Sequence, residues 1–283
     1  MMPEMHSTIS STEEHAGLIG RPRLAVLDSG VGGLPYLHWV YREFPAASYL
    51  YLADTAAFPY GNRGADELTG LVLSRIDCLQ AEFQPDLYLI ACNTASVVAL
   101  ESLRKQFNVP FVGVVPAVKP AAIKSRKRRI GIIATSGTVV NTYTNRLIAE
   151  FAADCTVVRY AGQDIVDFVE RSYARSGPDD RLNAVREACA YFIDQDVDSL
   201  VLGCTHFLHL RSEFQTVLGP EIEVVDSVEG VGRQVLRKLR ELPVEASGNP
   251  TYRIYTTGFG AEASYRDFSR IYGAEYQGAL PCP

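Results

Sequence analysis

Short runs of consecutive apolar residues recur along the first half of the chain, and each ends at a glycine-rich or polar segment. They are RLAVLD followed by SGVGG (23–33), ASYLYLADT (47–55), DLYLIACNTAS (86–96) and FVGVVPAV (111–118). Segments with helical spacing of apolar residues lie between them, such as ADELTGLVLSRIDCLQAEF (65–83). Strands that are apolar throughout are typical of parallel sheets buried on both faces. Their alternation with helices predicts an α/β fold with mostly parallel sheets.

The pattern restarts near the middle of the chain, where RIGIIATSGTVV (129–140) repeats the order of a basic residue, an apolar run and a Ser-Gly turn. Ser29 and Ser136 lie 107 residues apart, and Cys92 and Cys204, each at the end of an apolar run, lie 112 apart. Two similar offsets favour an internal repeat of about 110 residues, although any two Rossmann-like halves share this order of elements. Both interpretations predict two pseudo-symmetric Rossmann-like or flavodoxin-like domains, with the active site in the cleft between them.

The predicted domain boundaries follow from this repeat. We expect a first α/β domain of residues 21–117 together with 226–283, and a second of residues 118–225. The segment that begins EVVDSVEGVGRQVLRKL (223–239) would add a strand and a helix and return the chain to the first domain. Residues 1–20 are polar and lack the apolar stretch of a secretion signal, so we expect them to form a disordered tail.

Composition narrows the functional classes. Hydrophobic residues make up 47% of the 283 residues and charged residues 21%, as in globular proteins that bury a sizeable core. The formal net charge of −6 argues against nucleic acid or an anionic membrane as the main partner. No apolar run approaches the ~20 residues that a membrane span needs. Together with the missing export signal, this leads us to expect a cytoplasmic protein.

Six cysteines without a C-x-x-C pair predict reduced thiols and no disulfide framework. Free cysteine is among the most buried residue types, so Cys78, Cys155 and Cys189 are expected in the core. Cys282, next to the C-terminus, is expected to be exposed and to have no role.

Cys92 and Cys204 differ from the other cysteines because each lies where a predicted strand meets a loop and precedes polar residues. In parallel sheets, ligands bind beyond the carboxyl ends of the strands. Further polar residues at such ends are Asp28, Ser29, Asp54 and Thr135. If the two halves face each other, all six residues converge on one cleft.

The two cysteines suggest a chemistry. A thiol with a pKa near ~8.5 is mostly protonated at neutral pH and needs a neighbouring group to act as a base. His206, two residues after Cys204, can exchange a proton with that thiol, and Asp28, on a neighbouring strand, is the predicted helper of Cys92. Two unequal thiols on opposite faces of one carbon suit removal of a proton from one face and its return to the other. A single thiolate would equally suit acyl transfer.

No metal or cofactor is expected. The histidines lack zinc-ligand spacing with the cysteines, and no lysine context suggests a pyridoxal Schiff base. A glycine loop such as SGVGG (29–33) can cradle a phosphate. This loop, however, lacks both the complete dinucleotide pattern G-x-G-x-x-G and a P-loop lysine.

Seven blocks, in order over residues 23–230, resemble the signature segments of the glutamate racemases, which are cofactor-independent members of the aspartate/glutamate racemase superfamily. The blocks are LDSGVGGLPYL, YLADTAAFPYG, ACNTASVVALE, GVVPAVKPA, IGIIATSGTVVNTY, LVLGCTHF and VVDSVEGV. TTGF near Thr256 resembles a C-terminal motif of the family. The resemblance implies cofactor-independent interconversion of L- and D-glutamate, which supplies D-glutamate for bacterial peptidoglycan.

The same resemblance implies the site residues. Cys92 and Cys204 match the two catalytic cysteines, Asp28 and His206 match residues that assist them, and Glu170 loosely matches a glutamate between the halves. The residues that match substrate contacts are Asp28, Ser29, Tyr60, Gly61, Asn93, Thr94, Thr138, Thr205 and His206. Backbone N–H groups after Ser29 and after the cysteines, with threonine hydroxyls, would hold the two carboxylates of glutamate.

The chain departs from the family pattern at three places. Ala57 stands where the family usually has an arginine, CTHFLHL (204–210) replaces C-T-H-Y-P, and AGQ (161–163) replaces A-C-P. These departures leave open the role of Glu170, the formation of a homodimer, and activation by a cell-wall precursor. Two alternatives also remain: an aspartate or hydantoin racemase of the same superfamily, and a non-catalytic protein that binds an acidic ligand.

Overall fold

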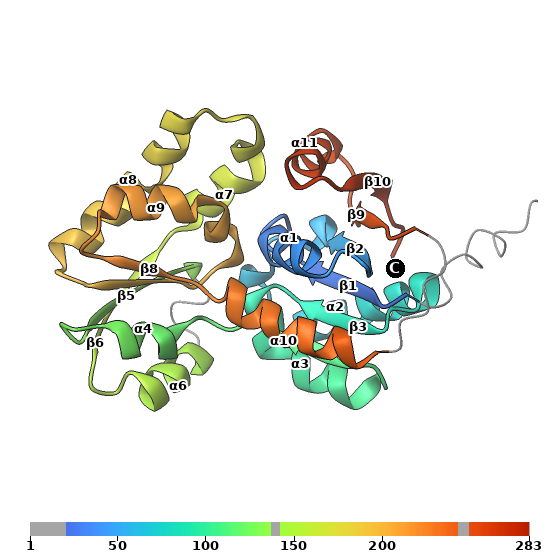
Figure 1. Ribbon diagram of the computed structural model, residues 1–283, viewed down its shortest axis with the longest axis horizontal. Coiled ribbons are helices and arrows are strands. Elements are labelled where there is room, and N and C mark those ends of the chain that lie inside the picture. The colour runs from blue at the N-terminus through green and yellow to red at the C-terminus, as the bar shows by residue number, and fades with distance from the viewer. Residues whose placement is uncertain (1–20, 137–141, 243–248, 283) are drawn as a thin grey trace, which may run out of the picture.

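The computed structural model describes residues 21–136, 142–242 and 249–282, which form two halves, each built on one sheet (Figure 1). The six-stranded sheet has the order β10-β9-β2-β1-β3-β4, and the four-stranded sheet has the order β6-β5-β7-β8. Every described strand pair is parallel. The predicted α/β class with two mostly parallel sheets is therefore confirmed.

Seven of the ten described strands match apolar runs of the sequence, whereas the strands at 156–161, 252–256 and 275–279 contain charged or polar residues and were not predicted. The first sheet consists of β1 (Arg23–Asp28), β2 (Ser48–Ala53), β3 (Leu87–Ile90), β4 (Phe111–Gly113), β9 (Tyr252–Thr256) and β10 (Glu275–Ala279). The second consists of β5 (Arg129–Ala134), β6 (Thr156–Ala161), β7 (Ser199–Leu202) and β8 (Glu223–Val225). In β2, β3 and β7 every residue is buried. These inner strands are covered on both faces, which explains why their sequences are apolar throughout instead of alternating.

Helices cover the faces of both sheets. The α-helices are α1 (Leu34–Glu43), α2 (Ala65–Phe83), α3 (Asn93–Gln106), α4 (Val118–Lys124), α6 (Thr142–Phe151), α7 (Gln163–Arg171), α8 (Pro178–Asp194), α9 (Arg211–Leu218), α10 (Val228–Glu241) and α11 (Glu262–Tyr272). Short 3-10 segments are η2 (Thr55–Ala57), η3 (Tyr60–Asn62), η4 (Tyr173–Arg175) and η5 (Thr205–Leu210). In Figure 1, α8 and α9 lie on one face of the second sheet and α4 and α6 on the other. Among the residues that the structure describes, none of the helices combines the length and apolar character that a membrane span requires.

The two sheets repeat one strand order. β2-β1-β3-β4 in the first sheet corresponds to β6-β5-β7-β8 in the second, which is the flavodoxin-like order. β3 and β7 are therefore equivalent, and each is followed by one of the two conspicuous cysteines: Cys92 immediately precedes α3, and Cys204 immediately precedes η5. The same strand order thus occurs in both halves, as both interpretations of the residue spacing predict.

After β8 the chain returns to the first sheet. α10 packs against α1, and the Tyr36 hydroxyl lies 2.7 Å from the hydroxyl of Ser227. β9 and β10 then extend the first sheet beyond β2. The chain passes between the sheets at residues 114–117 and 226–227. We keep the boundaries 21–117 with 226–283, and 118–225, as a proposal that these two connections support. The tail predicted for residues 1–20 lies outside the described residues.

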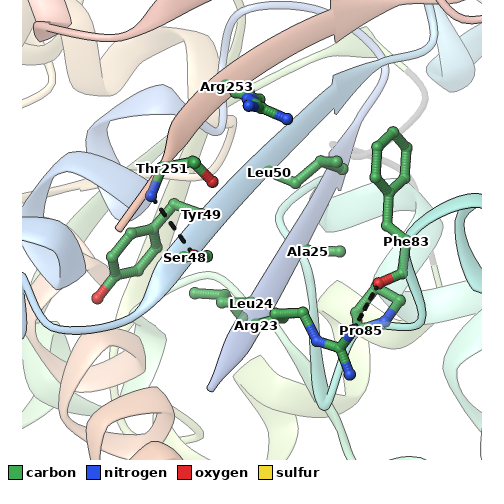
Figure 2. Close-up of a pocket in the computed structure, with 10 residues that line it drawn as sticks. All are labelled: Arg23, Leu24, Ala25, Ser48, Tyr49, Leu50, Phe83, Pro85, Thr251 and Arg253. Atoms are coloured by element: carbon green, nitrogen blue, oxygen red, sulfur yellow. Dashed lines mark hydrogen bonds between the residues drawn. The ribbon is translucent and has the colours of Figure 1, made fainter. Parts of the chain in front are cut away.

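A small pocket of about 40 Å³ lies at the amino ends of β1, β2 and β9 (Figure 2). Arg23 and Arg253 border it, and the Arg23 guanidinium donates a hydrogen bond to the Phe83 carbonyl at 3.3 Å. Parallel sheets bind their ligands at the carboxyl ends of the strands. This pocket therefore lies at the end of the sheet away from the predicted site.

Several predictions about the cysteines are wrong. Cys78 on α2 and Cys282 after β10 form a disulfide across 204 residues, with their Cα atoms 5.7 Å apart, so these two thiols are not reduced. The chain after β10 packs on the apolar cluster that α2 also covers, a proximity that sequence spacing does not reveal. Cys78 and Cys155 are only partly buried and Cys282 is partly buried instead of exposed, whereas Cys189 lies in the core as expected.

Loss of the disulfide is expected to destabilise the protein. Cys282→Ser should lower the free energy of unfolding in non-reducing buffer by about 2–4 kcal/mol, because the crosslink restricts the unfolded chain over a long loop. Thermal unfolding followed by circular dichroism, with and without dithiothreitol, would measure this. The reductant should lower the midpoint of the wild type and leave that of Cys282→Ser unchanged. Cys155→Ser removes an unpaired thiol and should respond like the wild type. Identical wild-type curves in both buffers would contradict the disulfide.

Candidate active site

The carboxyl ends of three strands bring the two unpaired cysteines of the predicted site together. β1 and β3 are neighbours, with Leu27 paired to Ile90, so Asp28 and Cys92 follow adjacent strands. Cys204 follows β7 in the other sheet. Cys92 and Cys204 are 8% and 9% exposed and line one cavity of about 30 Å³. The other predicted site residues that line this cavity are Ser29, Tyr60, Gly61, Asn93, Thr94, Thr205 and His206.

Asp28 forms the acidic side of the site and is fully buried. Its Oδ1 accepts a hydrogen bond from Gly30 N–H at 3.0 Å, and its Oδ2 accepts one from the Thr205 hydroxyl at 3.2 Å. Burial raises the pKa of Asp28 to about 6, although the nearby charge of His206 and the Gly30 N–H oppose the rise. Asp28 is thus a carboxylate at neutral pH but close enough to its pKa to take a proton.

Cys92 is a thiol in this environment. Burial raises the pKa of Cys92 well above its usual value, and the negative charge of Asp28 raises it further. The backbone N–H groups of Ala95 and Thr94 partly offset this rise by hydrogen bonding to the sulfur. Cys92 therefore carries its proton at neutral pH and can donate it only to a strong base, such as a carbanion.

Cys204 has a different neighbour. Its Sγ lies 3.6 Å from His206 Nδ1, and the other ring nitrogen, Nε2, lies 2.6 Å from Glu170 Oε1. Burial alone would lower the pKa of His206, but the hydrogen bonds to Cys204 and Glu170 raise it well above its usual value. A protonated imidazole has a donor on both nitrogens, which matches the two acceptors that the ring faces.

Glu170 enters the site from α7, a position that the loose sequence match left open. Its Oε1 also accepts a hydrogen bond from Val31 N–H at 2.8 Å. A Cβ atom on Gly30 would lie 1.8 Å from that oxygen, so the loop can approach Glu170 this closely only with glycine at position 30. The glycine loop therefore holds a carboxylate of the chain itself rather than a phosphate.

The loop also corrects the expectation about substrate carboxylates. The N–H groups of Gly30 and Val31, which were expected to bind substrate, are taken by Asp28 and Glu170. Asn93, the first residue of α3, links the two cysteine segments. Its Nδ2 donates a hydrogen bond at 3.1 Å to the carbonyl of Gly203, the residue before Cys204, while Asn93 itself directly follows Cys92. The predicted contact Thr138 lies outside the described residues.

A buried network behind Tyr60 was not predicted. The Tyr60 hydroxyl donates to Asp54 Oδ2 at 2.8 Å, and Asp54 Oδ1 faces Arg75 Nε at 3.0 Å and the Thr257 hydroxyl at 2.6 Å. Sequence reasoning placed Asp54 at a strand end but had no signal for Arg75, which lies within an ordinary helical pattern. This network holds Tyr60 at the edge of the cavity.

Other lining residues were also missed: Phe58, Pro59, Val166 and Gly203. Thr135, expected only as a strand-end residue, lines the cavity too. Within the described ranges, no cluster of three His, Cys, Asp or Glu side chains could hold a metal ion. The groups at the cavity that can exchange protons are two thiols and a histidine, with the buried carboxylate of Asp28 bonded to the lining residue Thr205.

Comparisons with known proteins place the chain in a family. A family profile described as Asp/Glu/hydantoin racemase matches residues 41–234. The chain is 39% identical to a glutamate racemase of Treponema pallidum over 259 residues, which is 90% of this chain and 96% of the relative. It is 40% identical to a glutamate racemase of Shewanella sp. (strain MR-7) over 78% of this chain and 81% of the relative.

Solved structures agree. The structure of Escherichia coli glutamate racemase in complex with L-glutamate and the activator UDP-MurNAc-Ala superposes with a TM-score of 0.85 at 32% identity, over 92% of this chain and 98% of that one. Glutamate racemase RacE1 from Bacillus anthracis superposes with a TM-score of 0.77 at 27% identity, over 92% of this chain and 98% of that one. The fold, the paired thiols and the extent of these matches show that the chain belongs to the Asp/Glu/hydantoin racemase family.

Proposed function

We propose that this chain is a glutamate racemase, which interconverts L- and D-glutamate by proton transfer at the α-carbon without a cofactor. The observation that carries this proposal is the pair of thiols: Cys92 and Cys204 follow equivalent strands of two repeated sheets and line one cavity. The relatives from T. pallidum, Shewanella and E. coli are named glutamate racemases, which favours glutamate over other substrates of the family.

Each thiol would serve one face of the α-carbon. In one direction, a Cys204 thiolate takes the α-proton, and the electron pair of the broken C–H bond stays on the carbon as a carbanion delocalised into the adjacent carboxylate. The Cys92 S–H then delivers its proton to the opposite face. The resulting Cys204 thiol and Cys92 thiolate are the starting forms for the reverse reaction. One proton leaves the carbon and one is added, so the reaction needs no further reactant.

Asp28 and His206 would adjust the protonation of the two thiols between turnovers. With a pKa of about 6, Asp28 is a much weaker base than the Cys92 thiolate, so the proton stays on Cys92 at rest, and its transfer to the carboxylate before the reverse reaction is uphill. His206 Nδ1 would exchange a proton with Cys204, while Glu170 holds the ring by its other nitrogen. The two enantiomers have equal free energy in water, so kcat/KM must be the same in both directions. The inequality of the two thiols can therefore affect only the separate values of kcat and KM.

D-glutamate from this reaction would supply peptidoglycan synthesis in the cytoplasm. The E. coli structure contains L-glutamate and UDP-MurNAc-Ala, and we propose glutamate as substrate and a cell-wall precursor as activator for this chain as well. A cavity of about 720 Å³ supports the second part, because it borders both connections between the sheets, at Pro116 and Ser227. A ligand bound there would contact the segments that set how the two sheets face each other. Formation of a homodimer stays a prediction.

Deuterium exchange tests the reaction directly. Incubation with L-glutamate in D₂O, without added cofactor, should give D-glutamate that carries deuterium at the α-carbon, because the delivered proton comes from a thiol that exchanges with solvent. Proton NMR would follow the α-proton signal, and circular dichroism would follow racemisation. L-aspartate and a 5-substituted hydantoin are the comparison substrates, and faster turnover of either would reassign the substrate. If none of the three gains deuterium, the chain is not a racemase and the binding-protein alternative takes its place.

Substitution of either thiol tests the two-base mechanism. Cys92→Ser and Cys204→Ser should each lower kcat about 10³-fold, because a serine hydroxyl is a much weaker acid than a thiol at neutral pH. Cys189→Ser is the matched control, since this free thiol is also buried but lies on α8 outside the cavity. It should keep the wild-type kcat. Near-normal turnover by either cavity variant would rule out a two-thiol mechanism.

The role of Asp28 predicts an acid limb in the pH profile. As pH falls through about 6, Asp28 becomes protonated and can no longer accept a proton, so kcat/KM should decline. Asp28→Asn should lower kcat about 10²-fold at pH 8 and remove this limb. Asp198→Asn, at the amino end of β7 and bonded to Ser125, should keep it. An unchanged limb in Asp28→Asn would assign the titration to another group.

A further inference from the structure

His209 is a buried histidine that neither the sequence blocks nor the proposed proton transfers account for. It lies in η5, the segment that also carries His206, and is 6% exposed. Its Nε2 lies 3.0 Å from the Val31 carbonyl oxygen, and its Nδ1 lies 2.9 Å from the Tyr272 hydroxyl. One ring thus contacts the glycine loop after β1 and helix α11, which are far apart in sequence.

The partners of the ring define its protonation. Burial lowers the pKa of His209 to about 3, so the ring is neutral at physiological pH. The Val31 carbonyl can only accept a hydrogen bond, so Nε2 carries the proton and donates it. Nδ1 is then the acceptor for the Tyr272 O–H. Edge-on packing against the rings of Tyr173, Phe268 and Tyr272 holds the imidazole in this orientation.

The backbone of Val31, meaning the two peptide groups on either side of its Cα and called the Val31 peptide below, connects His209 to the Cys204 side of the site. Its carbonyl accepts from His209, and its N–H donates to Glu170 Oε1 at 2.8 Å. The same Glu170 oxygen lies 2.6 Å from His206 Nε2, and His206 Nδ1 faces Cys204 Sγ at 3.6 Å. A displacement of this peptide would therefore move the carboxylate that orients His206.

The glycine loop cannot move without also moving the segment that carries His206. A Cβ atom on Gly32 would lie 2.2 Å from Thr205 Oγ1 and 2.9 Å from His206 Nδ1, so the loop backbone rests directly on the segment that carries His206. On the Cys92 side, Asp28 also depends on the loop through the Gly30 N–H, but Thr205 holds Asp28 and Gly203 holds Asn93 from outside the loop. Movement of the Val31 peptide would therefore affect Cys204 more than Cys92.

We propose that His209 is a positioning residue of the racemase site, which fixes the Val31 peptide and through it the Glu170–His206 pair beside Cys204. Tyr272 of α11 is part of this arrangement because it holds the acceptor nitrogen of His209. The inference rests on the proposed racemase function for its kinetic consequences. His209 does not line the cavity, so its effect reaches the substrate only through these residues.

His209→Phe keeps a ring among the three aromatic neighbours and removes both hydrogen bonds. It should lower kcat about tenfold, with KM changed by less than about twofold, since two buried hydrogen bonds are lost outside the cavity. Alkylation of Cys204 by iodoacetamide, followed by peptide mass spectrometry, should slow about tenfold. The thiolate is the form that reacts, and displacement of protonated His206 removes the cation that stabilises it. Alkylation of Cys92 in the same sample should stay within about twofold of the wild-type rate.

A conservative variant separates positioning from packing. The amide of His209→Gln can donate to Val31 and accept from Tyr272, so kcat and Cys204 alkylation should return to within about threefold of the wild type. His38→Phe is the matched control: His38 packs edge-on against the same Tyr272 ring, lies on α1, and forms no described hydrogen bond to residues 28–33. It should leave both readings unchanged.

The outcomes are distinct. If a folded His209→Phe keeps the wild-type kcat and the wild-type rate of Cys204 alkylation, the proposal is overturned. It is also overturned if alkylation of Cys92 and of Cys204 slows equally and His209→Gln does not restore the rates. If His209→Phe does not fold, Tyr272→Phe decides: Cys204 alkylation should slow about threefold with Cys92 unchanged, and a wild-type rate would overturn the proposal. Alkylation needs no turnover, so this test can succeed or fail even if deuterium exchange shows that the chain is not a racemase.

Discussion

A carboxylate buried between two sheets is unfavourable unless both sides supply hydrogen bonds, and Asp28 receives them from both. Gly30 N–H reaches it from its own loop, and the Thr205 hydroxyl reaches it from the other half of the chain. This contact ties the carboxyl end of β1 to that of β7. Because β3 is bonded to β1, the same contact sets where Cys92 faces Cys204, and the cavity between the sulfurs depends on it.

The repeated topology provides two equivalent strand ends, but the surroundings of the two thiols are not equivalent. Cys92 lies in the field of a carboxylate, which keeps its proton in place, whereas Cys204 lies beside a histidine that Glu170 holds. Inversion of a carbon needs a proton acceptor on one face and a proton donor on the opposite face, and it does not need identical groups on both. The departure from symmetry is therefore compatible with a reaction that runs in both directions.

The C-terminal elements support the site through hydrogen bonds to residues around the cavity. Thr257, after β9, bonds Asp54; Ser264, in α11, bonds the Glu170 carbonyl; and Tyr272, at the end of α11, bonds His209. None of these three lines the cavity. The return of the chain to the first sheet thus adds support to groups contributed by both halves.

The sequence by itself determined seven of the ten described strands, their repeat in two halves and the position of the two cysteines at strand ends, because continuous apolar runs and the polar residues that end them are local features. Blocks such as D-S-G and C-T-H also indicated which side chains to expect there. Only the tertiary structure decided that Arg75 supports Tyr60, that Glu170 and not a phosphate fills the glycine loop, and that Cys78 is joined to Cys282. Each of these contacts joins segments far apart along the chain. Whether these segments meet depends on how loops and helices pack over the sheets, and no local pattern of residues encodes the distance between them.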